Sequence, residues 1–222
     1  MIVSKNDILS DIIISQPNII PLINRFGILL GTGDKSIKQA CYDCNLDSDF
    51  IVTILNTYIN DDFFPENDLK IFNTKIIINY ISKTYTYYNK YMLPNIERHF
   101  NLLIAHSGEN NNLHLIKYFF EEIKSDIIKF IEHDINQWFP SITKLEANEF
   151  TNCHKIQPYD TFSIEEKIKD LKSMLIIHLK GIYDINLCYA VISSIVFFEK
   201  DLQQNNRIRN RILSLIYTEL IK

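Results

Sequence analysis

The fold class is decided by residues 113–138, LHLIKYFFEEIKSDIIKFIEHDINQW. One row of side chains recurs there every three or four residues: Ile116, Phe120, Ile123, Ile127, Phe130, Asp134 and Trp138. This spacing places about one side chain per turn on a single face, so it predicts an amphipathic helix. The row is apolar except at Asp134, which the predicted helix would carry into the core.

Three further stretches repeat this pattern. Their rows are Ile81, Tyr85, Tyr88, Met92, Ile96, His99, Leu103 and His106; Ile164, Ile168, Leu171, Leu175 and Leu179; and Leu187, Val191, Ser194, Phe198, Leu202, Asn205, Arg209 and Ile212. Four long amphipathic helices joined by loops of modest length predict an all-α fold with an antiparallel four-helix bundle over residues 72–222. Pro94 should kink the first helix, because proline removes a helix hydrogen bond and its ring crowds the preceding turn.

Residues 1–66 are expected to form a small helical domain. It contains a glycine-rich corner, Gly31-Thr32-Gly33-Asp34, in which the glycines would make a tight turn and Asp34 would cap the next helix. The acidic stretch NDDFFPEND, residues 60–68, is predicted to link this domain to the bundle.

Composition excludes several classes of protein. Of the 222 residues, 46% are hydrophobic and 23% charged, which is typical of a globular chain and not of a disordered one. Five glycines and six prolines are too few for a turn-dense all-β fold. A net charge of −4 argues against a nucleic-acid or anionic-membrane surface for this chain alone. With no apolar run long enough to span a membrane and no leader pattern, a cytoplasmic location is expected.

The order of these features resembles the hemerythrin-like Ric proteins, which repair iron centres. The shared parts are the LGxGDK corner inside RFGILLGTGDKSIKQAC (residues 25–41), the Leu93-Pro94 pair, WFPSI (138–142) and FEKDLQQNNRI (198–208). The resemblance implies a small N-terminal domain, a hemerythrin-like bundle, and a role in iron-sulfur cluster repair or in sensing nitrosative and oxidative stress. It also implies a di-iron cofactor held by single histidines and His-x-x-x-Glu pairs.

The ligand positions that the resemblance implies are mostly occupied by other residue types. They fall at Tyr85 on the first helix, Phe130 and Asp134 on the second, Glu165 or Glu166 on the third, and Asn205 and Arg209 on the fourth. Asp134 alone is a credible ligand. None of the six histidines has an acidic residue four positions later. The Cys-Cys-Gly-Gly corner of better-known members is also replaced, by Gly31-Thr32-Gly33-Asp34, so its thiol chemistry is absent.

These observations lead to a metal-free, non-catalytic protein as the first hypothesis. It would act as a sensory or protein-interaction module with a protein partner, and Arg209 would replace the lost cation by pairing with Asp134, Glu165 or Glu166. The alternative is an iron-binding repair protein with unusual ligands, His106, Asp134, Glu165, Glu166 and His99. A third hypothesis is a homodimer formed through residues 1–66.

The CYDC motif, Cys41 to Cys44, has the spacing of a redox pair or of half a zinc site. No second cysteine pair completes a zinc site, and no βαβ pattern surrounds the motif. We interpret it as two thiols near a helix end, with Cys41 in the core.

Overall fold

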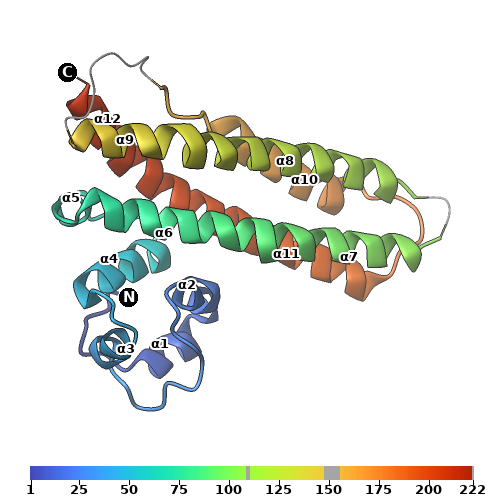
Figure 1. Cartoon of the computed structure of the whole chain (residues 1–222). Helices are drawn as coiled ribbons and strands as arrows, with labels where there is room; N and C mark the ends of the chain where they lie inside the picture. Colours follow the sequence, from blue (N-terminus) through green and yellow to red (C-terminus); the bar gives the residue numbers. More distant parts are fainter. Residues whose placement is uncertain (109–110, 148–155, 222) are drawn as a thin grey trace. The chain divides into compact units, whose positions relative to one another are not determined.

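The computed structural model describes residues 1–108, 111–147 and 156–221, and the chain is all-α (Figure 1). Within these ranges the only β-type pairing is an isolated antiparallel bridge between Ile8 and Ser36. The four helical stretches predicted from periodicity are confirmed. The chain divides into two compact units: unit 1 comprises Met1–Thr84 and Arg207–Ile216, and unit 2 comprises Tyr85–Asn206 and Tyr217–Lys222.

Unit 1 is built from short helices and the beginning of a long one. Its elements are α1 (Leu9–Ser15), η1 (Pro17–Ile19), α2 (Ile20–Arg25), α3 (Ile37–Asp43), α4 (Ser48–Ile59), α5 (Glu66–Ile71), α6 (Thr74–Tyr87) as far as Thr84, η4 (Arg209–Leu213) and the start of α12 (Ser214–Leu220). The predicted boundary near residues 66–72 is therefore displaced. The acidic stretch 60–68 lies within unit 1, and the division between the units falls inside α6.

Aromatic rings hold the core of unit 1 together. Phe26 stacks on Tyr80 with ring centroids 5.4 Å apart, and Phe50 meets the Tyr80 ring edge-on at 6.1 Å. All three side chains are buried. Because Tyr80 lies on α6, this cluster ties α6 to the N-terminal helices.

The glycine-rich corner makes the predicted turn but not the predicted cap. Gly31 and Gly33 adopt φ values of +86° and +56°, which side chains with a Cβ rarely tolerate. However, α3 begins at Ile37, and its cap is Ser36, which forms a reciprocal capping box with Gln39. The prediction that Asp34 caps this helix is wrong, because the turn continues for two more residues.

Unit 2 contains η2 (Tyr88–Met92), α7 (Leu93–Ala105), α8 (Leu113–His133), η3 (Asp134–Trp138), α9 (Phe139–Glu146), α10 (Phe162–Ile177) and α11 (Ile185–Ile208) as far as Asn206. Polar contacts join neighbouring helices: Glu97–Lys124 between α7 and α8, Asp126–Lys167 between α8 and α10, Lys172–Glu199 between α10 and α11, and His99–Ser194 between α7 and α11. Each of these four helices thus contacts two others.

Two π-helical segments of unit 2 have a local cause. Both η2 and η3 end two residues before a proline, Pro94 and Pro140 respectively. The carbonyl four residues before each proline belongs to Lys90 or Asn136, inside the widened turn. A proline cannot donate to that carbonyl and its ring would collide with it, so the turn opens. The segment η4 is not followed by proline, and nothing in the structure explains it.

No helix in the described ranges is both long enough and apolar enough to cross a membrane.

A buried asparagine fastens the N-terminal residues of unit 1 to α4. The Asn56 side chain accepts from the Val3 backbone N–H at 2.8 Å and donates to the Val3 carbonyl at 2.9 Å. One turn later Asn60 contacts the backbone of Met1 in the same way, but at the exposed surface.

We therefore expect Asn56→Ala to lower the free energy of unfolding by about 2 kcal/mol, because two buried backbone groups lose their partners. The matched variant Asn60→Ala should cost less than about 1 kcal/mol, since water replaces the lost bonds. Urea unfolding of both variants measures the difference, and equal losses would contradict this account.

Candidate functional site

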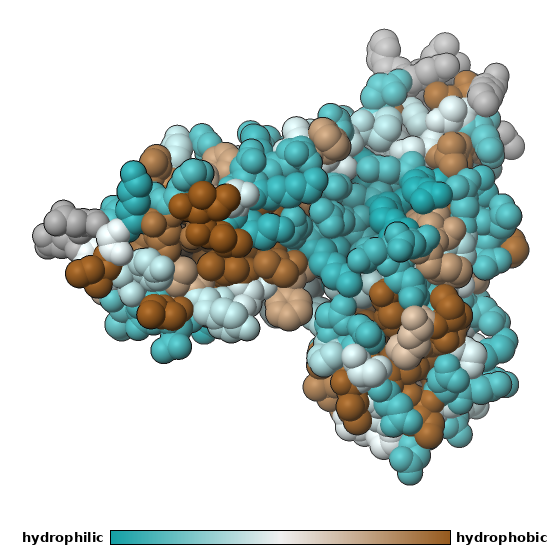
Figure 2. Space-filling view, turned by 180° about the vertical axis from the view of Figure 1, so that it is seen from behind, coloured by the Kyte–Doolittle hydropathy of each residue, from teal (hydrophilic) through white to brown (hydrophobic). Residues whose placement is uncertain are grey.

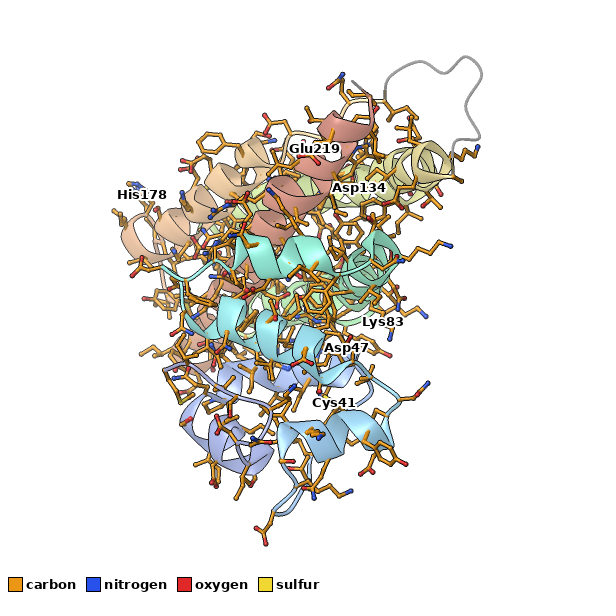
Figure 3. The ribbon with its side chains drawn as sticks, turned by 90° about the vertical axis from the view of Figure 1, so that its left-hand side faces the viewer. Cys41, Asp47, Lys83, Asp134, His178 and Glu219 are labelled. Carbon is orange, nitrogen blue, oxygen red and sulfur yellow. The ribbon has the colours of Figure 1, made fainter. Side chains whose placement is uncertain are left out.

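The candidate site is centred on Asp134, the first residue of η3, whose side chain is completely buried in unit 2 (Figure 3). The Tyr85 hydroxyl donates a hydrogen bond of 2.7 Å to Asp134 Oδ2. Burying a carboxylate is costly unless hydrogen bonds compensate for its lost hydration. A phenol hydroxyl at this distance provides a short, charge-assisted bond of that kind.

Aromatic rings surround the tyrosine. The Phe130 ring meets Tyr85 edge-on with centroids 5.1 Å apart, and the Phe139 ring stacks on it at 6.0 Å. Phe130 is one helical turn before Asp134 on the same face of the long helix. The structure thus brings together three of the predicted ligand positions, Tyr85, Phe130 and Asp134, as a phenol, a phenyl ring and one carboxylate.

A second polar cluster lies along α11. Asn205 Nδ2 donates to the Tyr88 hydroxyl at 3.1 Å and to the Asp201 carbonyl at 2.6 Å, and it lies 3.4 Å from Asp201 Oδ2. Asn205 and Asp201 are both buried. Sequence reasoning identified Asn205 but missed Asp201, because that residue is one position off the core-facing row. The available signal was the position of Asp201, one helical turn before Asn205 on the same face of the helix.

Of the two alternatives on the third helix, Glu165 is the residue that contacts the interior. Glu165 Oε1 accepts from Asn206 Nδ2 at 2.7 Å, whereas Glu166 pairs with Lys169 at the surface at 2.6 Å. Burial raises the pKa of the Glu165 carboxyl, and the hydrogen bond from Asn206 offsets part of that effect.

The histidines do not assemble into a ligand set. His106 is exposed after the last residue of α7, with Nδ1 2.9 Å from the Leu102 carbonyl. The whole of α8, about 30 Å at 1.5 Å per residue, separates this end of the helices from Asp134. His99 is half-buried, with Nδ1 3.0 Å from Ser194 Oγ, and burial lowers its pKa. The structure thus does not bring His106 into one site with Asp134.

His133 is a neighbour that sequence reasoning did not select. Its Nδ1 lies 3.4 Å from Asp134 Oδ1, and its ring centroid is 5.8 Å from that of Tyr159. Residues that share a helix face are three or four positions apart, so the spacing of the sequence gives no signal for a contact between the adjacent residues His133 and Asp134.

Arg209 is buried, and its Nη1 donates to the Asn210 side-chain oxygen at 2.6 Å. Its placement in the interior agrees with its position on the core-facing row. Pairing of Arg209 with Asp134, Glu165 or Glu166 stays a prediction.

This arrangement does not fit a di-iron centre of the hemerythrin type. Such a centre needs several imidazoles converging with carboxylates, and the positions that would supply them hold Tyr85, Phe130 and Asn205. In the described ranges no group of three or more histidine, cysteine, aspartate or glutamate side chains is placed to hold a metal ion.

The CYDC motif has the expected arrangement of two thiols near a helix end, with Cys41 in the core. Cys41 is buried within α3, and Cys44 follows the end of that helix. Both are free thiols. Burial, together with the nearby Cys44 and Asp47, raises the pKa of Cys41 to about 11, so it carries little thiolate at neutral pH.

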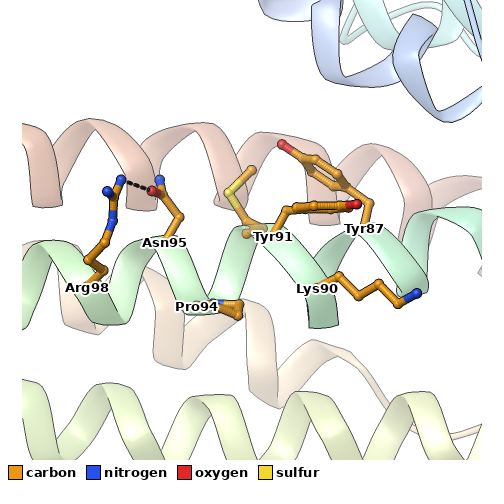
Figure 4. Close-up of a pocket in the computed structure, with 7 residues that line it drawn as sticks. Tyr87, Lys90, Tyr91, Pro94, Asn95 and Arg98 are labelled. Carbon is orange, nitrogen blue, oxygen red and sulfur yellow. Dashed lines mark hydrogen bonds between the residues drawn. The ribbon is translucent and has the colours of Figure 1, made fainter.

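A surface hollow of about 380 Å³ lies beside η2 in unit 2 (Figure 4). Its lining residues are Tyr87, Lys90, Tyr91, Met92, Pro94, Asn95 and Arg98, and Arg98 donates to Asn95 at 2.8 Å. None of the predicted site residues lines this hollow.

Comparison of the chain with protein-family models, curated proteins and solved structures finds no significant match.

The tyrosine hydroxyl should make a measurable contribution to stability. We expect Tyr85→Phe to lower the free energy of unfolding by about 2 kcal/mol, because a buried charged acceptor loses a donor. Tyr91→Phe is the matched control at an exposed position and should change it by less than about 0.5 kcal/mol. Denaturant unfolding compares the two, and a neutral Tyr85→Phe would contradict the compensating role of this bond.

Glu165 should make stability depend on pH. Because its pKa is raised in the folded state, the folded chain holds this proton more tightly than the unfolded chain. The wild type should lose stability relative to Glu165→Gln as pH rises from about 4 to about 7, since glutamine cannot ionise. Unfolding at both pH values tests this, with Glu166→Gln as the surface control. A difference that stays constant with pH would contradict the prediction.

Proposed function

We propose that this chain is a hemerythrin-like protein whose bundle has exchanged its iron centre for side-chain packing and hydrogen bonds. The helix contacts in unit 2 support the bundle part of the proposal, because α7, α8, α10 and α11 are each joined to two others. The sequence resemblance to the Ric proteins supports the family part.

One observation carries the metal-free part: the 2.7 Å hydrogen bond between the Tyr85 hydroxyl and Asp134 Oδ2. Asp134 is the one credible ligand at the implied positions, and its carboxylate is engaged with a neighbouring side chain. The Phe130 and Phe139 rings fill the space beside it. One oxygen of this carboxylate is engaged by the phenol, and the phenyl rings beside it supply no metal-binding atoms, so an iron at Asp134 would lack the imidazole ligands of a di-iron centre.

As a function, we propose a non-catalytic sensory or protein-interaction module with a protein partner, in a cytoplasmic setting linked to nitrosative or oxidative stress. The stress link rests on the resemblance alone. The lack of a ligand set around Asp134 in the described ranges favours interaction over cluster repair.

The test is the iron content and visible spectrum of untagged protein purified from iron-supplemented cells. We expect less than about a tenth of an iron per chain and no absorption of a bridged di-iron centre. Two irons per chain would overturn the proposal and favour the repair protein with unusual ligands. Asp134→Asn and His106→Ala would then show whether iron is held at Asp134, as that alternative requires.

A gain-of-ligand variant provides the positive control. Tyr85→His, Phe130→His, Asp134→Glu, Asn205→His and Arg209→Glu together restore the residue types that the resemblance implies on the first, second and fourth helices. Iron uptake by this variant, with none by the wild type, would locate the loss of metal at these five positions.

A further inference from the structure

An exposed apolar patch covers the end of unit 2 where α10 ends and α11 begins. It consists of Ile176, Ile177, Ile182, Ile185, Tyr189, Val196 and Phe197, which we call the α10–α11 patch. The first five of these side chains are between 62% and 82% exposed. Figure 2 shows hydrophobic side chains gathered on this part of the surface.

The register of α10 against α11 places the α10 part of the patch beside its α11 part. Glu165 contacts Asn206 and Lys172 contacts Glu199, so the two helices run antiparallel with a fixed offset. Extending that offset places Ile176 level with Ile195 and beside Val196. On α11 itself, Ile185, Tyr189 and Val196 lie four and seven residues apart, which aligns them in one stripe.

The size of the patch matches one side of a stable protein interface. Its seven side chains expose on the order of 800 Å², which is about the area that each partner contributes to a standard complex. Patches of this size are uncommon on the surfaces of proteins that stay monomeric. None of the seven residues is charged, so the patch offers no complement to a strongly charged partner.

We propose that the α10–α11 patch is the interface of a homodimer in which a second copy of this chain covers it. A two-fold axis brings the same patch of both copies together, and a helix stripe is complementary to itself when two α11 helices cross. This inference rests on the protein-interaction part of the proposed function. It differs from dimerisation through residues 1–66.

The experiment measures the mass of the full chain in solution by light scattering and sedimentation, from micromolar to submillimolar concentration. Wild type should reach twice the chain mass of 26.2 kDa. Ile185→Asp should be monomeric, with the dimer Kd raised at least about 100-fold because each interface loses two apolar contacts and gains two buried charges. An acid at the first position of α11 suits the helix dipole, so folding should be unaffected, as circular dichroism would verify.

Leu29→Asp is the matched control in unit 1, because Leu29 and Ile185 are each 75% exposed. It should remain dimeric. Ile182→Asp, in the loop before α11, is a second disrupting variant that leaves the helix untouched. A monomeric wild type, an Ile185→Asp dimer, or a Leu29→Asp monomer would each overturn the proposal. Iron content measured on the same samples tests the metal-free proposal independently, so a failure of the dimer proposal is distinguished from a failure of the proposed function.

Discussion

The interior of unit 2 depends on keeping the Asp134 carboxylate satisfied without exposing it to water. Its side chain is fully buried, and an uncompensated charge at that depth would cost several kcal/mol. The Tyr85 hydroxyl meets this need from the neighbouring helical segment, and the Phe130 and Phe139 rings hold the phenol in place. The residues that surround the acid are therefore constrained by its need for a hydrogen-bond donor in a dry interior.

The same constraint extends along α11. Glu199, Asp201, Gln204, Asn205 and Asn206 are all buried there, in a helix whose other buried residues are apolar. Asn205 contacts both Asp201 and Tyr88, and Asn206 contacts Glu165 on α10. Such a network adds little net stability compared with a well-packed apolar core, but it penalises any other helix register, because a shift would leave several polar groups without partners.

The sequence predicted the four long helical stretches well, because one apolar row per helix is a strong signal. It failed at one local turn and where the outcome depends on contacts between distant residues. Asp34 looked like a cap, but the turn through Gly33 runs on to Ser36. The acidic stretch 60–68 looked like a linker, but packing of Tyr80 on Phe26 draws the start of α6 into unit 1.

At the candidate site, the sequence identified Asp134 and Tyr85. Identifying Asp201, and choosing between Glu165 and Glu166, requires the orientation of each helix about its axis. That orientation is set by tertiary packing. The periodicity of the sequence determines it only to within about one residue.

We propose that protein side chains have replaced the metal. The most direct test is to measure the thermal unfolding midpoint, Tm, of apo-protein under anaerobic conditions as ferrous iron is added in increasing concentration. A ligand that binds only the folded state must raise Tm as its concentration increases. The account predicts a Tm that does not change with iron. A Tm that rises steadily with iron, and that loses this response in Asp134→Asn, would contradict it.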